Sequence, residues 1–200
     1  MIAIIDYGVG NLKSVYKALI KLGFKAQITA KEEDINKSNG IILPGVGAFR
    51  DAINHLIDSG LIDCLKKNIY SGKPILGICL GMQLLYDKSY EDGEWDGLGL
   101  LKGDVVRFGD GLKVPHMGWN QLVKGVDDPI GKDVEGEYVY FVHSYYVKPQ
   151  KNEEVVFWTD YGVKVPAVVR KGNILGMQFH PEKSGETGMK LLRNFGELIK

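Results

Sequence analysis

The sequence predicts an α/β fold in which a central, mostly parallel sheet carries helices on both faces and the second half of the chain is rich in β-strands. Three observations support this prediction: short runs of aliphatic residues without a polar face, stretches with helical periodicity that follow these runs, and many short β-like runs from Asp104 onward. Aliphatic strands that alternate with helices are typical of a parallel sheet covered on both sides.

The first strand is expected at residues 2–5, which are all aliphatic. A glycine-containing turn follows at residues 7–10. Asn11 is then expected to cap a helix that runs to residue 22, because leucines and a valine recur there at helical spacing. Gly23 is expected to end this helix, since glycine is the usual residue beyond a helix C-terminus.

Further alternation follows along the first half of the chain. The expected elements are a strand at 40–43, helices at 48–58 and 61–70, a third strand at 74–78, and a helical pattern from Cys79 to Tyr86. The carboxyl ends of parallel strands meet at one edge of a sheet, and ligands bind beyond that edge. We therefore expect the turns at Gly8, Gly45 and Cys79 to lie near one another.

The second half is dominated by runs rich in valine, tyrosine, phenylalanine and isoleucine. These runs occupy residues 138–147, 155–159, 167–170 and 174–179, and a last helix is expected at 185–200 with Leu192, Phe195 and Ile199 on one stripe. The sequence contains no internal repeat, low-complexity tract or long linker. We therefore expect one domain that spans residues 1–200.

The composition excludes several classes of protein. The 200 residues carry 25 basic and 25 acidic side chains, so there is no net charge that would favour nucleic acid or an anionic membrane. Two cysteines cannot form a disulfide-dense scaffold. The N-terminus lacks the pattern of a signal peptide, and no apolar stretch reaches the ~20 residues of a membrane helix. We expect a soluble cytoplasmic protein.

Cys79 is the strongest candidate for chemistry. The segment 77–81 reads Gly-Ile-Cys-Leu-Gly, which is the cysteine version of the G-x-S-x-G nucleophile elbow between a strand and a helix. Flanking glycines allow the tight turn, and the unpaired N–H groups of the helix that begins at Leu80 favour a thiolate and an oxyanion. The alternative is a buried structural cysteine, which is the interpretation that we favour for Cys64 within a helix.

A cysteine nucleophile needs a base, and His180 is the best placed of four histidines. It directly follows the predicted strand at 174–179, and Glu182 two residues later can face the same site and orient the imidazole. The other interpretation is a surface turn with incidental charges, and His55 is expected on a helix surface. Cys79, His143, His180 and Glu182 could in principle bind zinc, but no pair has the usual close spacing.

The turn at 44–47, Pro-Gly-Val-Gly, could supply a second oxyanion donor from the N–H of Val46 or Gly47, although this segment taken alone favours a simple strand-to-helix turn. Residues 8–11 match only half of a dinucleotide fingerprint, and there is no P-loop motif. We therefore expect no cofactor and no metal.

Residues 77–83 and 178–182 resemble, in the right order, the two signatures of the class I glutamine amidotransferases of the triad type, and the resemblance covers essentially the whole chain. It implies a flavodoxin-like, amidotransferase-like sheet and a glutaminase that uses a covalent thioester. The roles that it implies are catalysis by Cys79, His180 and Glu182, oxyanion stabilisation by Val46, Gly47 and Leu80, and glutamine binding by Gly47, Gln83, Ser144 and Tyr145.

Five further stretches, at 5–12, 44–49, 115–120, 141–145 and 182–185, resemble one branch of this family. The branch consists of glutaminase subunits that form a heterodimer with a (β/α)₈-barrel cyclase subunit in histidine biosynthesis. A length of 200 residues suffices for a glutaminase domain that releases ammonia but leaves no room for a second domain that consumes it. This agrees with a separate acceptor subunit. We expect an exposed loop to face that partner through Pro115, His116, Met117, Trp119 and Asn120, with Trp119 as an anchor.

Alternatives remain at this point. The chain could be the glutaminase of a different synthase, such as that of anthranilate, guanylate or aminodeoxychorismate. It could also be a non-catalytic regulatory subunit that has kept the fold, or a cysteine peptidase with the same elbow. Stretches 115–120 and 141–145 argue against the first alternative and the intact set of three residues argues against the second.

Overall fold

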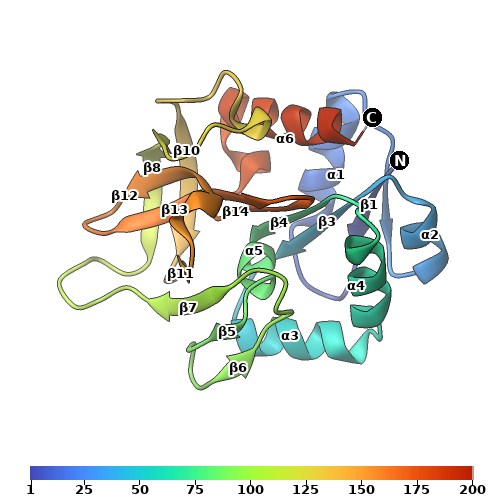
Figure 1. Ribbon diagram of the computed structural model, residues 1–200, viewed down its shortest axis with the longest axis horizontal. Helices are drawn as coiled ribbons and strands as arrows, with labels where there is room; N and C mark the ends of the chain where they lie inside the picture. Colours follow the sequence, from blue (N-terminus) through green and yellow to red (C-terminus); the bar gives the residue numbers. More distant parts are fainter. Residues whose placement is uncertain (200) are drawn as a thin grey trace.

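The computed structural model describes residues 1–199 and confirms the predicted α/β fold class around one large sheet (Figure 1). In sheet order, its eight strands are β2 (Ala26–Thr29), β1 (Ile2–Ile5), β3 (Gly40–Gly45), β4 (Ile75–Cys79), β14 (Ile174–Met177), β13 (Lys164–Lys171), β12 (Val155–Asp160) and β9 (Val123–Lys124). The strands from β2 to β14 are parallel to their neighbours, and those from β14 to β9 are antiparallel. The sheet is therefore parallel where the predicted elbow lies.

Helices cover both faces of this sheet, as predicted. They are α1 (Leu12–Lys21), α2 (Glu32–Lys37), α3 (Phe49–Asp58), α4 (Ile62–Tyr70), α5 (Leu80–Leu84) and α6 (Gly185–Leu198). Helices α1 and α6 lie on one face and α3 and α4 on the other (Figure 1). Alternate residues of β1 and β3 belong to the two separate core clusters, for example Ile4 with α1 and α6 and Ile5 with α3 and α4. This two-sided burial explains why these strands have no polar face.

Two smaller sheets lie beside the large one. One pairs β8 (His116–Gln121) with β10 (Tyr138–His143), and the other has the order β11 (Tyr145–Pro149), β7 (Gly103–Arg107), β5 (Lys88–Ser89) and β6 (Trp95–Asp96). All of these strands except β5 and β6 come from the β-rich second half. Short 3₁₀ helices occur at Pro129–Gly131, Asn152–Glu154 and Pro181–Lys183. Within residues 1–199, no helix is both long and apolar enough to cross a membrane.

Most predicted elements are present with small shifts at their ends, and the differences have simple causes. The sequence reasoning missed β2, α2, β5 and β6, because these short segments show little apolar periodicity. The predicted run at 138–147 divides at Ser144 into two strands of different sheets. The last helix ends at Leu198, and residue 200 of its predicted span lies outside the described residues.

Candidate active site

Cys79 lies at a sharp turn where β4 ends and α5 begins. Its backbone has φ of 54° and ψ of −114°, which places a non-glycine residue in a strained conformation. A Cβ atom on Gly81 would lie 1.8 Å from the Leu43 carbonyl oxygen, and one on Gly77 would lie 2.6 Å from the Gly81 carbonyl oxygen. Both glycines are therefore required by close backbone packing, which confirms the predicted elbow.

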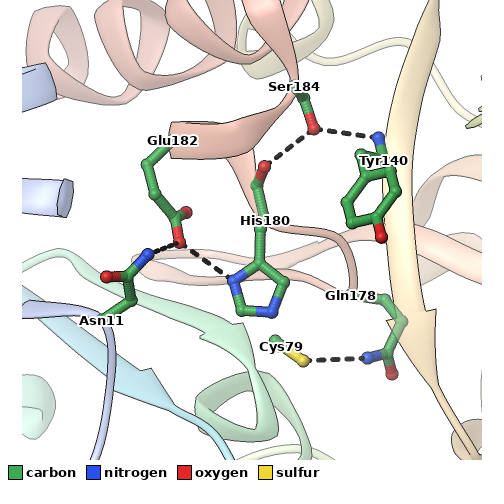
Figure 2. Close-up of polar contacts among 7 residues, drawn as sticks. All are labelled: Asn11, Cys79, Tyr140, Gln178, His180, Glu182 and Ser184. Carbon is green, nitrogen blue, oxygen red and sulfur yellow. Dashed lines mark hydrogen bonds and ion pairs between the residues drawn. The ribbon is translucent and has the colours of Figure 1, made fainter.

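The sheet brings His180 next to this elbow. Strand β14 runs parallel to β4 with Met177 opposite Ile78, so the chain that leaves β14 passes beside Cys79. The backbone of His180 is then held on both sides, because its N–H donates to the Tyr140 carbonyl at 3.3 Å and its carbonyl accepts from the Ser184 hydroxyl at 2.7 Å. The Ser184 oxygen also accepts from the Tyr140 N–H at 3.0 Å (Figure 2).

A hydrogen-bonded carboxylate orients the His180 ring. Nδ1 of His180 lies 2.9 Å from Oε1 of Glu182, and the two side chains are 4% and 0% exposed. Figure 2 shows the ring between this carboxylate and the Cys79 side chain. The same Oε1 accepts from the Asn11 amide at 3.0 Å. Asn11 is the N-cap residue of α1, as predicted, but its side chain makes no cap bond and reaches Glu182 instead.

The electrostatics of the site favour an ion pair between a protonated His180 and an ionised Glu182. Burial by itself lowers the pKa of His180, but its interactions with Cys79 and Glu182 outweigh burial and raise the pKa to about 9. Burial acts in the opposite direction on the carboxyl group and raises the pKa of Glu182. The hydrogen bond and charge of His180, together with the Asn11 amide, outweigh burial and hold that pKa below its usual value. His180 is thus protonated at neutral pH when Cys79 is a thiolate, with Glu182 ionised behind it.

Gln178 is a site residue that the sequence reasoning left without a role. It is fully buried, its amide nitrogen donates to the Cys79 sulfur at 3.9 Å, and its oxygen accepts from Nε2 of Gln83 at 3.0 Å. Nε2 of Gln83 also donates to the Tyr145 carbonyl at 2.9 Å. The available signal was the spacing of two between Gln178 and His180, which puts both on one side of an extended chain.

A cavity of about 330 Å³ opens over Cys79, near the lower end of the range for small-molecule sites. It is lined by Val46, Gly47, Cys79, Leu80, Gln83, Glu91, Pro115, Val142, His143, Ser144, Tyr145, His180 and Lys183. The structure therefore brings together the residues predicted for catalysis, oxyanion stabilisation and glutamine binding, with Glu182 directly behind His180. Glu91 and Lys183 are charged lining residues that the sequence reasoning missed.

The turn after β3 lies beside the nucleophile. Gly45 is the register partner of Cys79 in the β3–β4 pair, and a Cβ on Gly45 would lie 2.6 Å from the Gly81 nitrogen. Gly47 follows with φ of +92°, and the Val46 side chain is 40% exposed on the rim of the cavity. The position of this turn agrees with the predicted location of a second oxyanion donor.

The segment predicted to be an exposed loop is largely strand β8. Met117 and Trp119 are 59% and 54% exposed, as expected, but His116 is fully buried. The expectation of a loop and of an exposed His116 is therefore wrong, because successive residues of a strand point to opposite sides. Pro115 lies just before the strand and lines the cavity, and Asn120 is half-buried and donates to the Asp160 carbonyl.

Comparisons with known proteins agree with this geometry. Residues 3–198 match the family model described as glutamine amidotransferase class-I. A solved structure described as PurLQS from Thermotoga maritima has a TM-score of 0.79 at 23% identity and covers 100% of this chain and 98% of that one. A second, described as a glutamine amidotransferase, has a TM-score of 0.76 at 22% identity over 98% of both chains. These structures confirm the amidotransferase-like fold.

Several closer relatives are described as imidazole glycerol phosphate synthase subunit HisH. The protein from Caldanaerobacter subterraneus is 54% identical across 100% of this chain and 99% of its own length. That from Carboxydothermus hydrogenoformans is 50% identical across 100% of both. The chain belongs to the class I glutamine amidotransferase family and, within it, to the family of these HisH subunits.

Proposed function

We propose that this chain is the glutaminase subunit of imidazole glycerol phosphate synthase, in which Cys79, His180 and Glu182 hydrolyse glutamine to glutamate and ammonia. The observation that carries the proposal is the strained Cys79 elbow beside a His180–Glu182 pair at the floor of a small cavity. The family match over residues 3–198 agrees with one glutaminase domain along the chain.

The mechanism follows from the positions of these side chains. The Cys79 thiolate attacks the side-chain amide carbon of glutamine, and the resulting oxyanion accepts hydrogen bonds from the N–H of Leu80 and from the Val46–Gly47 turn. Imidazolium His180 then gives its proton to the departing nitrogen, the C–N bond breaks and ammonia leaves. His180, now neutral, takes a proton from water, which attacks the thioester, and the C–S bond breaks to release glutamate. Glu182 holds the ring in the required orientation throughout.

The charges of the cavity suit a free amino acid. Glu91 brings a carboxylate to the lining and Lys183 brings an ammonium group. Glu91 is fixed by accepting the Phe49 N–H at 2.7 Å. Burial raises the pKa of Glu91, and the α-ammonium group of a bound glutamine would compensate the buried negative charge of this carboxylate. The roles of Gly47, Gln83, Ser144 and Tyr145 in binding glutamine rest on their place in the same lining.

The direct test measures glutamate formed from glutamine by the full chain alone and after addition of a (β/α)₈ cyclase subunit with its ribotide substrate. We expect weak turnover alone and strong stimulation in the complex. No turnover under either condition, with Cys79 intact, would overturn the proposal. Strong turnover that the cyclase leaves unchanged would refute the assignment to this synthase.

We propose that the exposed side of β8 contacts the cyclase. Met117 and Trp119 are large apolar side chains that are more than half exposed on the strand that leads to the cavity wall, and Trp is enriched at interface hot spots. Replacing Trp119 by Ala should weaken binding of the cyclase by about tenfold or more. Exposed Tyr70 on α4 offers a control, because Tyr70→Ala removes a large ring elsewhere. Equal affinities of the two variants would contradict the placement.

A further inference from the structure

Two buried histidines face each other beside the cavity and take no part in the proposed chemistry. His116 on β8 and His143 on β10 are direct partners in the antiparallel register and are 0% and 7% exposed. Nδ1 of His116 lies 2.9 Å from Nε2 of His143. Nδ1 of His143 lies 2.8 Å from the Tyr145 carbonyl oxygen, in the cavity wall.

The carbonyl of Tyr145 fixes the direction of this chain of hydrogen bonds. A carbonyl oxygen only accepts, so Nδ1 of His143 must carry a hydrogen. Burial lowers the pKa of His143 to about 3, with the charges of His116 and His180 acting in the same direction and the Tyr145 bond opposing them. His143 is therefore neutral at neutral pH, its Nε2 accepts, and Nδ1 of His116 is the donor.

The same carbonyl connects the histidines to the nucleophile. The Tyr145 oxygen accepts a second hydrogen bond, from Nε2 of Gln83 at 2.9 Å. Gln83 donates to Gln178 at 3.0 Å, and Gln178 donates to the Cys79 sulfur at 3.9 Å. Continuous polar contacts thus lead from strand β8 through the cavity wall to the reacting sulfur. Two donors on one carbonyl oxygen restrict its position more than one would.

We propose that His143 and His116 are positioning residues for the glutaminase reaction: His143 holds the Tyr145 carbonyl, and His116 holds His143 in the tautomer that donates to it. Through that carbonyl the pair keeps Gln83 and Gln178 beside Cys79 and sets the wall that receives glutamine. This inference rests on the proposed function and adds two residues that act through others on the substrate.

The aromatic surroundings favour a fixed geometry for the pair. The His116 ring is stacked between Tyr161, at 3.9 Å and 20°, and Phe141, at 4.8 Å and 18°. Phe108 contacts both histidines, with ring centroids at 6.1 Å and 5.3 Å. Rings packed on both faces cannot turn freely, so each ring nitrogen of the pair stays opposite its hydrogen-bond partner.

The hydrogen-bonded series ends at Asn120, and this end makes the protonation state of His116 observable by spectroscopy. Nε2 of His116 lies 2.8 Å from Oδ1 of Asn120, whose amide nitrogen donates to the Asp160 carbonyl. Nε2 can donate to that oxygen only when His116 carries a second proton. Burial lowers the pKa of His116, with the Asn120 bond opposing it. His116 should therefore titrate below the usual histidine range, and His143 far below it.

The first experiment records nitrogen-15 NMR spectra of the histidine rings of the full chain between pH 8 and pH 4. The expected result is a neutral His143 with hydrogen on Nδ1 over the whole range and a His116 that gains a proton in the acidic part. A His143 with hydrogen on Nε2, or one that titrates near the usual value, would overturn the proposed donor direction.

The second experiment compares His143→Phe, which removes the donor, with His143→Asn, whose amide can replace Nδ1. The probe is 6-diazo-5-oxo-L-norleucine, a glutamine analogue that alkylates an activated thiol, and Cys79 labelling is followed by peptide mass spectrometry. The Phe variant should need about tenfold more probe for half-maximal labelling, as expected for loss of one buried hydrogen bond. The Asn variant should stay within about threefold of the wild type, as should a His55→Gln control on the exposed side of α3.

The outcomes separate this inference from the proposed function. Failure of the wild-type chain to be labelled at Cys79 would count against the glutaminase itself. A wild-type response in His143→Phe would overturn the positioning role and leave the glutaminase intact. Equal losses in the Phe and Asn variants, together with lowered melting temperatures, would show that the pair only supports folding and would also overturn the proposal.

Discussion

The two cysteines of this chain have the same exposure and very different surroundings. Cys64 on α4 and Cys79 at the end of β4 are each 7% exposed. Cys64 lies in ordinary helical backbone, and its sulfur contacts the side chains of Asn36 and Asn68 at 3.7 and 3.6 Å. Cys79 has a strained backbone, lines a cavity and lies beside His180.

The contrast shows that burial does not determine the chemistry of a thiol. Burial raises the pKa of Cys64, Glu32 raises it further, and the lysines Lys73 and Lys67 only partly oppose this, so the thiol stays protonated. Beside Cys79 lies instead His180, whose pKa is raised to about 9. The position of a cation and access to a cavity distinguish the two sulfurs.

The largest expected effect comes from removing each thiol in turn. Cys79→Ala should lower glutamine turnover by at least about 10⁴-fold, because the nucleophile is lost. Cys64→Ala should leave turnover unchanged and cost about 1 kcal/mol of stability through lost contacts. The measurements are glutamate formation and the free energy of unfolding in urea. The comparison fails if Cys64→Ala abolishes turnover or Cys79→Ala retains it.

The sequence predicts the Cys79 side of this contrast well. Two glycines that flank a cysteine between an aliphatic run and a helical pattern define the elbow locally, and close contacts of both glycines confirm it. The spacing of two residues between His180 and Glu182 extends the prediction to the base, but the strand order that brings β14 beside β4 is known only from the structure. The glycine-flanked cysteine and the spacing of His180 and Glu182 are local patterns, so they can be recognised in the sequence without the fold.

Contacts between distant segments were not predictable. Asn11 and Glu182 are 171 positions apart, and a residue with strong N-cap preference gives no sign that it binds a carboxylate instead. The apolar and aromatic residues of segment 115–120 suggest an exposed loop that includes His116, but pairing with β10 buries this histidine. Both contacts depend on how distant segments pack together, which no local periodicity reveals.

Removing the negative charge of Glu182 tests whether the cation beside Cys79 accounts for the difference between the two cysteines. In the wild type, kcat/KM should fall as the pH rises through about 9, because imidazolium His180 is needed to protonate the departing nitrogen. Glu182→Gln removes the negative charge that helps to raise this pKa, so the fall should begin at lower pH. Turnover at neutral pH should drop by up to about 10⁴-fold, as when a triad carboxylate is replaced by its amide.

Glu186→Gln makes the same charge change at an exposed position of α6 and serves as the matched control. Glutamate formation should be the readout, since ammonia itself changes protonation in this pH range. The raised pKa also predicts a stability contribution that is complete below the unfolded value near 6.5 and is lost as the pH rises through about 9. If kcat/KM falls at the same alkaline pH in Glu182→Gln as in Glu186→Gln, the assigned role of Glu182 is contradicted.

The smallest of these effects compares the glycines that lie near the two cysteines. Gly81, two residues after Cys79, would place a Cβ 1.8 Å from the Leu43 carbonyl oxygen, whereas Gly60, four residues before Cys64, has nothing within 4 Å of such an atom. Gly81→Ala should therefore cost about 3 kcal/mol, since the backbone of β3 must shift. Gly60→Ala should cost about 1–2 kcal/mol, because only its positive φ of +69° is unfavourable for alanine.

Urea unfolding measures the free energy of unfolding of both glycine variants. Glutamine turnover per folded molecule then shows whether the substitution disturbs the active site. A shift of β3 moves Gly45, which pairs with Cys79, so Gly81→Ala should impair turnover beyond its loss of folded protein. Gly60→Ala changes a turn between α3 and α4 and should leave the turnover of folded protein unchanged. If Gly81→Ala is as stable and active as Gly60→Ala, the elbow tolerates a side chain, and close packing cannot be the reason for glycine beside the nucleophile.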